Sequence, residues 1–143
     1  MKANTSTFFE IVVSNEIVDD KGERKRVTES YVTSAQTFTE AEANTYKHFG
    51  VGEDLDIKKI TIAPYSNIIH PKYAPEEPRY YKVAVKITVL DDHTMKEKHS
   101  KVYHLVEAAN IDTARANVYD AYKTTALDYD IVSLIETKIL EII

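Results

Sequence analysis

The stretch FFEIVVSNEIVDD, residues 8–20, decides the fold, because a related stretch, YYKVAVKITVLDD, follows at residues 80–92. Both alternate apolar and polar side chains, and both end in two aspartates. At a spacing of 72 residues their apolar positions correspond: Phe9, Ile11 and Val13 with Tyr81, Val83 and Val85. Alternation with a period of two predicts a half-buried strand at both places.

The correspondence between the two halves continues along the chain. Tyr31 matches Tyr103 at the same spacing, and after two slips of one residue the tetrapeptide DLDI at 54–57 matches DYDI at 128–131. The two places where the spacing between matching residues grows by one fall where turns are expected. Self-similarity at a nearly fixed period indicates an internal duplication.

Each half contains signals for three strands and one helix. We expect strands near 8–18, 27–35 and 57–63 in the first half, and near 80–90, 99–106 and 131–140 in the second. The segment FTEAEANTYKHFG, residues 38–50, predicts a helix, with Thr39 and Glu42 as a capping box. In the second half we expect Asp112 to cap the helix.

The predicted fold class is therefore α+β: a β-β-α-β unit present twice, giving a mainly antiparallel sheet of six strands with two helices packed on it. We expect a single domain, 1–143, made of two repeats. Repeat one covers 8–69, a proline-rich connector covers 64–79, and repeat two covers 80–143. All four prolines lie in the connector, where they restrain the backbone and remove ladder donors.

The paired aspartates of DLDI and DYDI raise the question of a metal site. Each pair offers too few oxygen ligands for Mg²⁺ or Ca²⁺, and no glycine-centred calcium loop surrounds it. We interpret both tetrapeptides as the same helix-to-strand turn, where aspartate side chains bond nearby backbone amides. We predict no metal and no cofactor.

The FTEAE residues, 38–42, follow an alternating strand, a charged hairpin and a short second strand. In this they resemble an uncharacterised domain family of Bacteroidetes bacteria and their phages that is marked by an FTEAE motif. The resemblance covers the whole chain. It implies no activity and transfers no functional residue, but it implies a phage or mobile-element protein acting in the cytoplasm of a host bacterium.

Composition narrows the function classes. The net charge is −5, from 18 basic and 23 acidic residues, so binding to nucleic acid would need a local basic patch. The chain has no cysteine, three glycines and no apolar run long enough to span a bilayer. Its five histidines form no catalytic or metal-binding motif. We expect a soluble, cytoplasmic, non-catalytic binding protein.

The outward face of the strand near 80–90 is the candidate site, because it carries an aromatic ring and lysines where repeat one has Phe8, Glu10 and Ser14. A ring interleaved with cations is typical of single-stranded nucleic-acid surfaces. The hairpin KGERKR, 21–26, adds a cationic tip. The candidate nucleic-acid or nucleotide-binding residues are Arg79, Tyr80, Lys82, Lys86, Lys101, Lys21, Arg24 and Arg26.

Three alternatives stay open. The lysines could only protect a solvated strand from edge-to-edge aggregation. The protein could instead sequester a small cyclic nucleotide used as an immune signal, gripping phosphate and base with Arg or Lys and Tyr. It could also be a protein-interaction or virion-associated subunit whose C-terminal stretch IVSLIETKILEII, 131–143, pairs with a partner or with a second copy in a homodimer.

Overall fold

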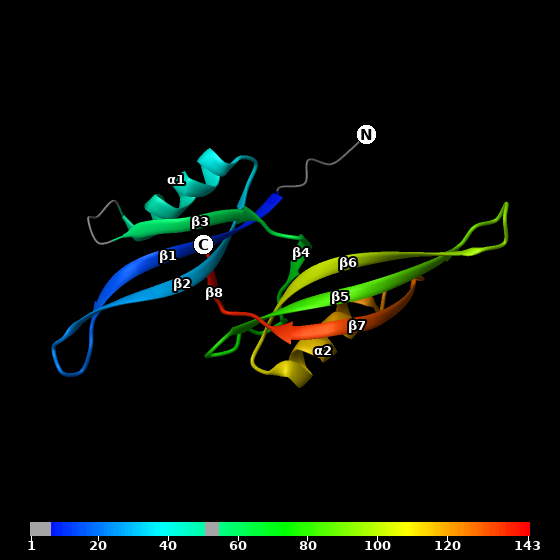
Figure 1. Cartoon of the computed structure of the whole chain (residues 1–143). Coiled ribbons are helices and arrows are strands. Elements are labelled where there is room, and N and C mark those ends of the chain that lie inside the picture. Colours follow the sequence, from blue (N-terminus) through cyan, green and yellow to red (C-terminus); the bar gives the residue numbers. More distant parts are fainter. Residues whose placement is uncertain (1–6, 51–54) are drawn as a thin grey trace. The chain divides into compact units, whose positions relative to one another are not determined.

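The computed structural model describes residues 7–50 and 55–143 of the chain. Eight strands and two helices form in these residues (Figure 1): β1 (Thr7–Val18), β2 (Arg24–Ala35), α1 (Phe38–Phe49), β3 (Asp56–Ile62), β4 (Tyr65–Ile69), β5 (Arg79–Leu90), β6 (Glu97–Ala108), α2 (Ile111–Tyr122), β7 (Asp128–Glu136) and β8 (Ile139–Ile142). The predicted α+β class, with two helices and a predominance of strand, is confirmed.

The strands form two mixed sheets, ordered β3-β1-β2-β8 and β4-β6-β5-β7, so the prediction of six strands in one sheet is wrong. The expected hairpin pairs β1–β2 and β5–β6 are antiparallel, as are β1–β3 and β5–β7. The two additional strands are β4 and β8, and both pair in parallel at a sheet edge. Strand β4 forms inside the expected connector, in the proline-free segment between Pro64 and Pro71. The expected strand at 131–140 breaks at Thr137 and Lys138, and β8 follows.

The chain divides into two compact units. Unit 1 comprises residues 1–63 and 138–143, and unit 2 comprises residues 64–137. Strand β4 follows β3 in sequence but pairs with β6 of unit 2, whereas β8 follows β7 but pairs with β2 of unit 1. The compact units and the two sequence repeats therefore divide the chain differently.

Each unit buries one face of its central strand against a helix. In unit 1, Phe9, Ile11 and Val13 of β1 are buried, as the alternation predicts, and α1 contributes Ala41 to the same core. In unit 2 the buried positions of α2 and of the β5 face toward it form one cluster: Tyr81, Val83, Val85, Ala114, Val118 and Tyr122. Among the described residues, no helix is long and apolar enough to cross a membrane.

The helix caps lie two residues earlier than predicted. Thr37 is the N-cap of α1, and its hydroxyl accepts from the Glu40 amide at 3.0 Å. Asn110, in place of Asp112, caps α2 and accepts from the Thr113 amide at 2.9 Å. The predicted stop of α1 is confirmed, since Gly50 has φ 85°, a conformation that glycine adopts without strain.

The two sheets have register shifts at equivalent positions of their strands. Register shifts lie between Val12 and Val13 in β1 and between Ala84 and Val85 in β5, positions 72 residues apart. The strand pairing also corrects one of the residue matches between the two halves of the sequence. Tyr31 faces Ile11, and the residue that faces Val83 is His104, so the counterpart of Tyr31 is His104 and not Tyr103.

The acidic tetrapeptides lie at strand starts. Asp128 to Ile131 open β7, so the interpretation of DYDI as a turn is wrong, and Asp56 and Ile57 open β3. Asp54 falls outside the described residues. Within the described part of the chain, no group of three or more His, Cys, Asp or Glu side chains could hold a metal ion.

Candidate nucleic-acid interface

Three of the four lysines of β5 and β6 lie on one side of the unit 2 sheet. Residues directly opposite each other in neighbouring strands share a face. The pairs Lys82–Leu105, Ala84–Tyr103 and Lys86–Lys101 therefore lie on the same face. We call the surface formed by Lys82, Lys86, Lys101 and Tyr103 the basic face.

Lys82 and Tyr103 make a direct contact at the centre of the basic face. The Lys82 ammonium lies 5.1 Å from the centroid of the Tyr103 ring, within cation–π range. Both side chains are half-buried. The contact places the ammonium over the Tyr103 ring, so the cation and the aromatic group occupy the same place on the basic face.

Lys86 and Lys101 lie directly opposite each other across β5 and β6. Like charges at such positions destabilise a sheet. Neither lysine has an ion-pair partner in the residues that the structure describes, although Asp130 of β7 lies opposite Lys86 on its other side. A bound anion would relieve the repulsion between the two lysines, so this pair favours a polyanionic ligand.

Tyr80 lies on the same side of β5 as Lys82 but is covered, and Arg79 lies on the other side of the strand. Tyr80 is only 5% exposed, so its ring is not accessible to a base, and Ala84 on the same face is 2% exposed. Arg79 lies 3.8 Å from Glu136 and is partly neutralised by it. The accessible ring is that of Tyr103, which we did not predict. The register of the β5–β6 hairpin, which places Tyr103 opposite Ala84, would have indicated it.

The remaining predicted residues lie at the β1–β2 hairpin of unit 1. Arg24 is 3.7 Å from Glu16, and the Nε of Arg26 donates to the Ser14 hydroxyl at 3.0 Å. The backbone amide of Lys21 donates to the Asp19 carboxylate at 2.9 Å, in the turn. The eight predicted residues therefore belong to two units, and of them Lys82, Lys86 and Lys101 are the accessible ones on the basic face.

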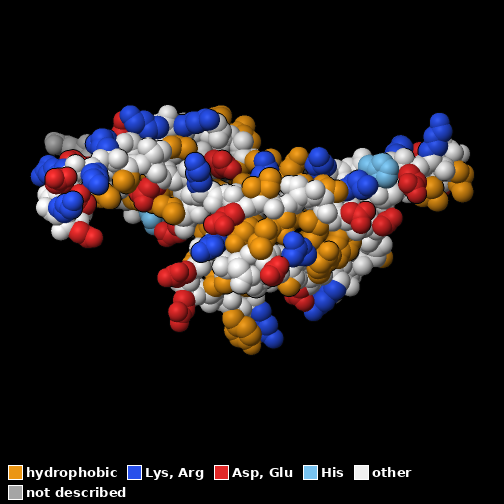
Figure 2. All heavy atoms as spheres, turned by 60° about the horizontal axis from the view of Figure 1, so that its bottom comes forward, with side chains coloured by type: hydrophobic (Ala, Val, Ile, Leu, Met, Phe, Trp, Pro, Cys, Tyr) orange, Lys and Arg blue, Asp and Glu red, His pale blue; other side chains and the backbone are white. Residues whose placement is uncertain are grey.

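An apolar surface also lies on unit 2, where hydrophobic side chains gather over α2 and β7 (Figure 2). Exposed apolar side chains are Tyr119 of α2 and Val132 and Ile135 of β7, and the register places Ile135 opposite Lys82, on the sheet face away from α2. β7 is an edge strand of its sheet. The stretch expected to pair with a partner, 131–143, is thus divided between β7 of unit 2 and β8, which already pairs with β2.

A family model described as Domain of unknown function (DUF4494) matches residues 7–143. This confirms the expectation of an uncharacterised family that covers nearly the whole chain. No curated protein and no solved structure matches the chain.

Proposed function

Because the chain belongs to the DUF4494 family, whose description assigns no activity, we propose a function from the geometry alone: the protein binds single-stranded nucleic acid, without catalysis, on the basic face of unit 2. Lys82, Lys86 and Lys101 follow the phosphates, and Tyr103 stacks a base. Stacking on an aromatic side chain contributes about 1–3 kcal/mol per base. We place this activity in the bacterial cytoplasm, in the phage or mobile-element context that the FTEAE residues imply.

The observation that carries the proposal is the Lys86–Lys101 pair. Two lysines directly opposite each other cost stability, and neither forms an ion pair within the described residues, although Asp130 lies opposite Lys86. Protection of a sheet edge does not account for the pair as a whole, because Lys86 lies between β6 and β7. It accounts at most for Lys101, which lies beyond the residues of β6 that pair with β4. A ligand that neutralises both lysines does account for it.

An internal duplication explains why one unit alone carries this face. It is supported by the element order β-β-α-β-β, present twice, and by the matching register shifts of β1 and β5. At equivalent places unit 1 has Glu10, Ser14 and Thr28, so the three lysines are particular to unit 2. Positions where copies of one scaffold differ in this way are not required by the fold.

The test is binding of a fluorescent single-stranded oligonucleotide, measured by anisotropy over a range of salt concentrations. The triple variant Lys82→Ala, Lys86→Ala, Lys101→Ala is expected to lose most of the affinity. If each lysine neutralises one phosphate, the slope of log K against log salt becomes shallower by about 2, since each single-strand contact contributes about 0.7. Tyr103→Ala is expected to weaken binding about tenfold with an unchanged salt slope.

The matched control changes the net charge equally at exposed lysines outside the basic face: Lys72→Ala, Lys96→Ala, Lys138→Ala. This variant should keep the wild-type salt slope within experimental error. Equal losses in both triple variants would show general electrostatic attraction and contradict a defined site. Absence of oligonucleotide binding by the wild-type protein would exclude the proposal.

A further inference from the structure

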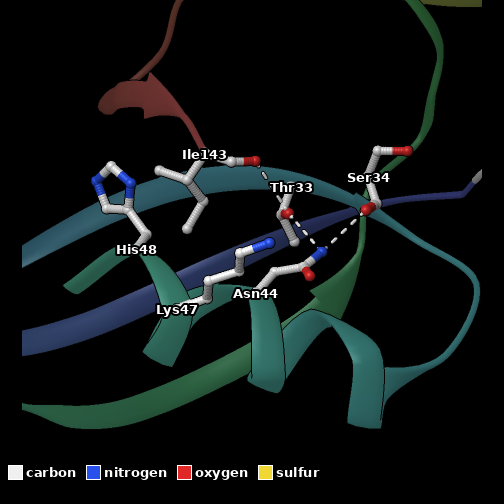
Figure 3. Close-up of a pocket in the computed structure, with 6 residues that line it drawn as sticks. All are labelled: Thr33, Ser34, Asn44, Lys47, His48 and Ile143. Atoms are coloured by element: carbon white, nitrogen blue, oxygen red, sulfur yellow. Dashed lines mark hydrogen bonds between the residues drawn. The ribbon is translucent and has the colours of Figure 1, made fainter. Parts of the chain in front are cut away.

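Unit 1 contains a pocket of about 520 Å³ between α1, the end of β2 and the residue that follows β8 (Figure 3). Thr33 and Ser34 come from β2, and Asn44, Lys47 and His48 from α1, while Ile143 forms an apolar wall. Pockets of 300–1,000 Å³ with a few convergent polar groups are typical of small-molecule sites. We propose that this pocket binds a small molecule through a phosphate group, with Lys47 as the cation that holds it.

The polar groups of the pocket divide into those already engaged and those left for a ligand. The Asn44 amide donates to the Thr33 hydroxyl and to the Ser34 carbonyl, each at 3.1 Å, and Thr33 donates to the Ile143 carbonyl at 3.1 Å. These bonds fix the walls of the pocket. His48 lies 3.6 Å from Glu141, so an acidic group already accompanies the imidazole.

Lys47 is different. Its side chain extends along the pocket and its ammonium points toward Thr33 and Ile143 (Figure 3). In the described part of the chain it has neither a hydrogen bond nor an ion pair. An ammonium has three donors and no acceptor, and it is a common phosphate binder as a point charge. The free cation over a concave, partly hydroxyl-lined surface therefore favours a phosphate.

Unit 2 provides an internal comparison for this pocket. Its counterpart of Asn44 is Asn117, which makes the same bond, from its amide to the Glu107 carbonyl at 3.1 Å. This asparagine ties the helix to the neighbouring strand in both units and is structural. By contrast, the position of Lys47 is occupied by Asp120, which pairs with Lys123 at 2.7 Å, and Val106 stands where unit 1 has Thr33. The Lys47 ammonium and the Thr33 hydroxyl thus occur only in unit 1, and the fold that both units share does not require them.

The experiment is isothermal titration of the full chain with three probes: adenosine 5′-monophosphate, inorganic phosphate and adenosine. The monophosphate and inorganic phosphate are expected to bind, and adenosine to bind at least tenfold more weakly than the monophosphate. Lys47→Ala should weaken phosphate binding about tenfold or more, the loss expected for one charge-assisted hydrogen bond. Lys47→Asp, which introduces the unit 2 side chain, should abolish it.

Lys59→Ala is the matched control, because Lys59 is an exposed lysine of the same unit outside the pocket. It should bind all probes as the wild type does. Lys47 is exposed as well, so both variants should keep the wild-type circular dichroism spectrum. Failure of both phosphate probes to bind, or binding that survives Lys47→Asp, would overturn the inference.

The two proposed sites are tested independently. Lys47→Ala should leave oligonucleotide binding unchanged, and the triple variant of the basic face should leave phosphate binding in the pocket unchanged. If phosphate binding is instead lost in the basic-face variant and kept in Lys47→Ala, the phosphate belongs to the basic face and the pocket proposal is wrong.

Discussion

His104 and Tyr122 form a buried polar pair at the centre of unit 2. The Tyr122 hydroxyl donates to the His104 Nε2 at 2.6 Å, and the other ring nitrogen bonds the Asn67 side chain. Burial lowers the pKa of His104, which favours the neutral ring. The counterparts in unit 1 are Tyr31 and Phe49, whose rings meet edge-on at 5.0 Å as His104 and Tyr122 do at 5.6 Å. The same packing contact therefore exists with a histidine in unit 2 and without one in unit 1.

This difference predicts that the free energy of unfolding falls as the pH drops below about 6.5, the ordinary pKa of histidine. Between that value and the lowered pKa of folded His104, the unfolded chain binds a proton that the folded chain excludes, so acid favours unfolding. Above that window the contribution is fully present. Urea denaturation at pH 5 to 8 measures the effect.

His104→Gln should flatten this part of the pH profile, since it removes the buried imidazole. His93→Gln is the control, because His93 is exposed in the β5–β6 hairpin. A profile that flattens equally in both variants would assign the pH dependence to histidines in general and contradict the role of His104.

At the scale of the elements, the start of α1 shows how two overlapping signals are resolved. The segment TFTEAE, 37–42, contains Thr37 with Glu40 and Thr39 with Glu42, and either pair could cap the helix. The structure uses the first pair. An earlier start directs Ala41 into the core and brings the Phe38 ring edge-on to Phe9 at 5.0 Å. Tertiary packing thus selects between two local signals of equal strength.

Thr37→Ala should therefore lower the free energy of unfolding by about 1 kcal/mol, the usual contribution of an N-cap side chain. Thr39→Ala, two residues later, should change it by less than about 0.5 kcal/mol, as exposed substitutions usually do. Chemical denaturation of the two variants and the wild type gives the comparison. A larger loss in Thr39→Ala would place the cap at the later threonine.

The elements also show what local sequence can predict. The alternation in β1 and β5 predicted both central strands and their buried faces, because a period of two is a local property. Strands β4 and β8 were missed, because each is short and pairs in parallel with a strand distant in sequence, which local pattern does not encode. Tyr80 was misplaced for a related reason, since alternation separates two faces of a strand without saying which parts of a face are covered. Of the basic face, Lys82 and Lys86 follow from the alternation of β5 and Lys101 from the expected neighbouring strand, whereas Tyr103 depends on the hairpin register.

For the whole molecule, the exchange of β4 and β8 between the two sequence repeats makes a prediction about fragments. Residues 64–137 contain all four strands and the helix of unit 2, whereas residues 70–143 have the same length, lack β4 and end in β8 without its partner β2. The first fragment should show a cooperative thermal transition by circular dichroism, and the second should melt at a lower temperature or without cooperativity. Equal behaviour of the two fragments would mean that β4 contributes little to unit 2.

The parallel pairing of β4 and β8 has a consequence for the internal duplication that we propose. In a half-length ancestor, the terminal strand of one polypeptide would have had its place beside the second strand of another, so that two identical molecules each completed the other. Joining two such genes end to end would turn that mutual completion into an internal one and free the copies to diverge. Lysines could then accumulate on one copy alone. In a symmetric pair of identical chains, every such substitution would appear in both copies.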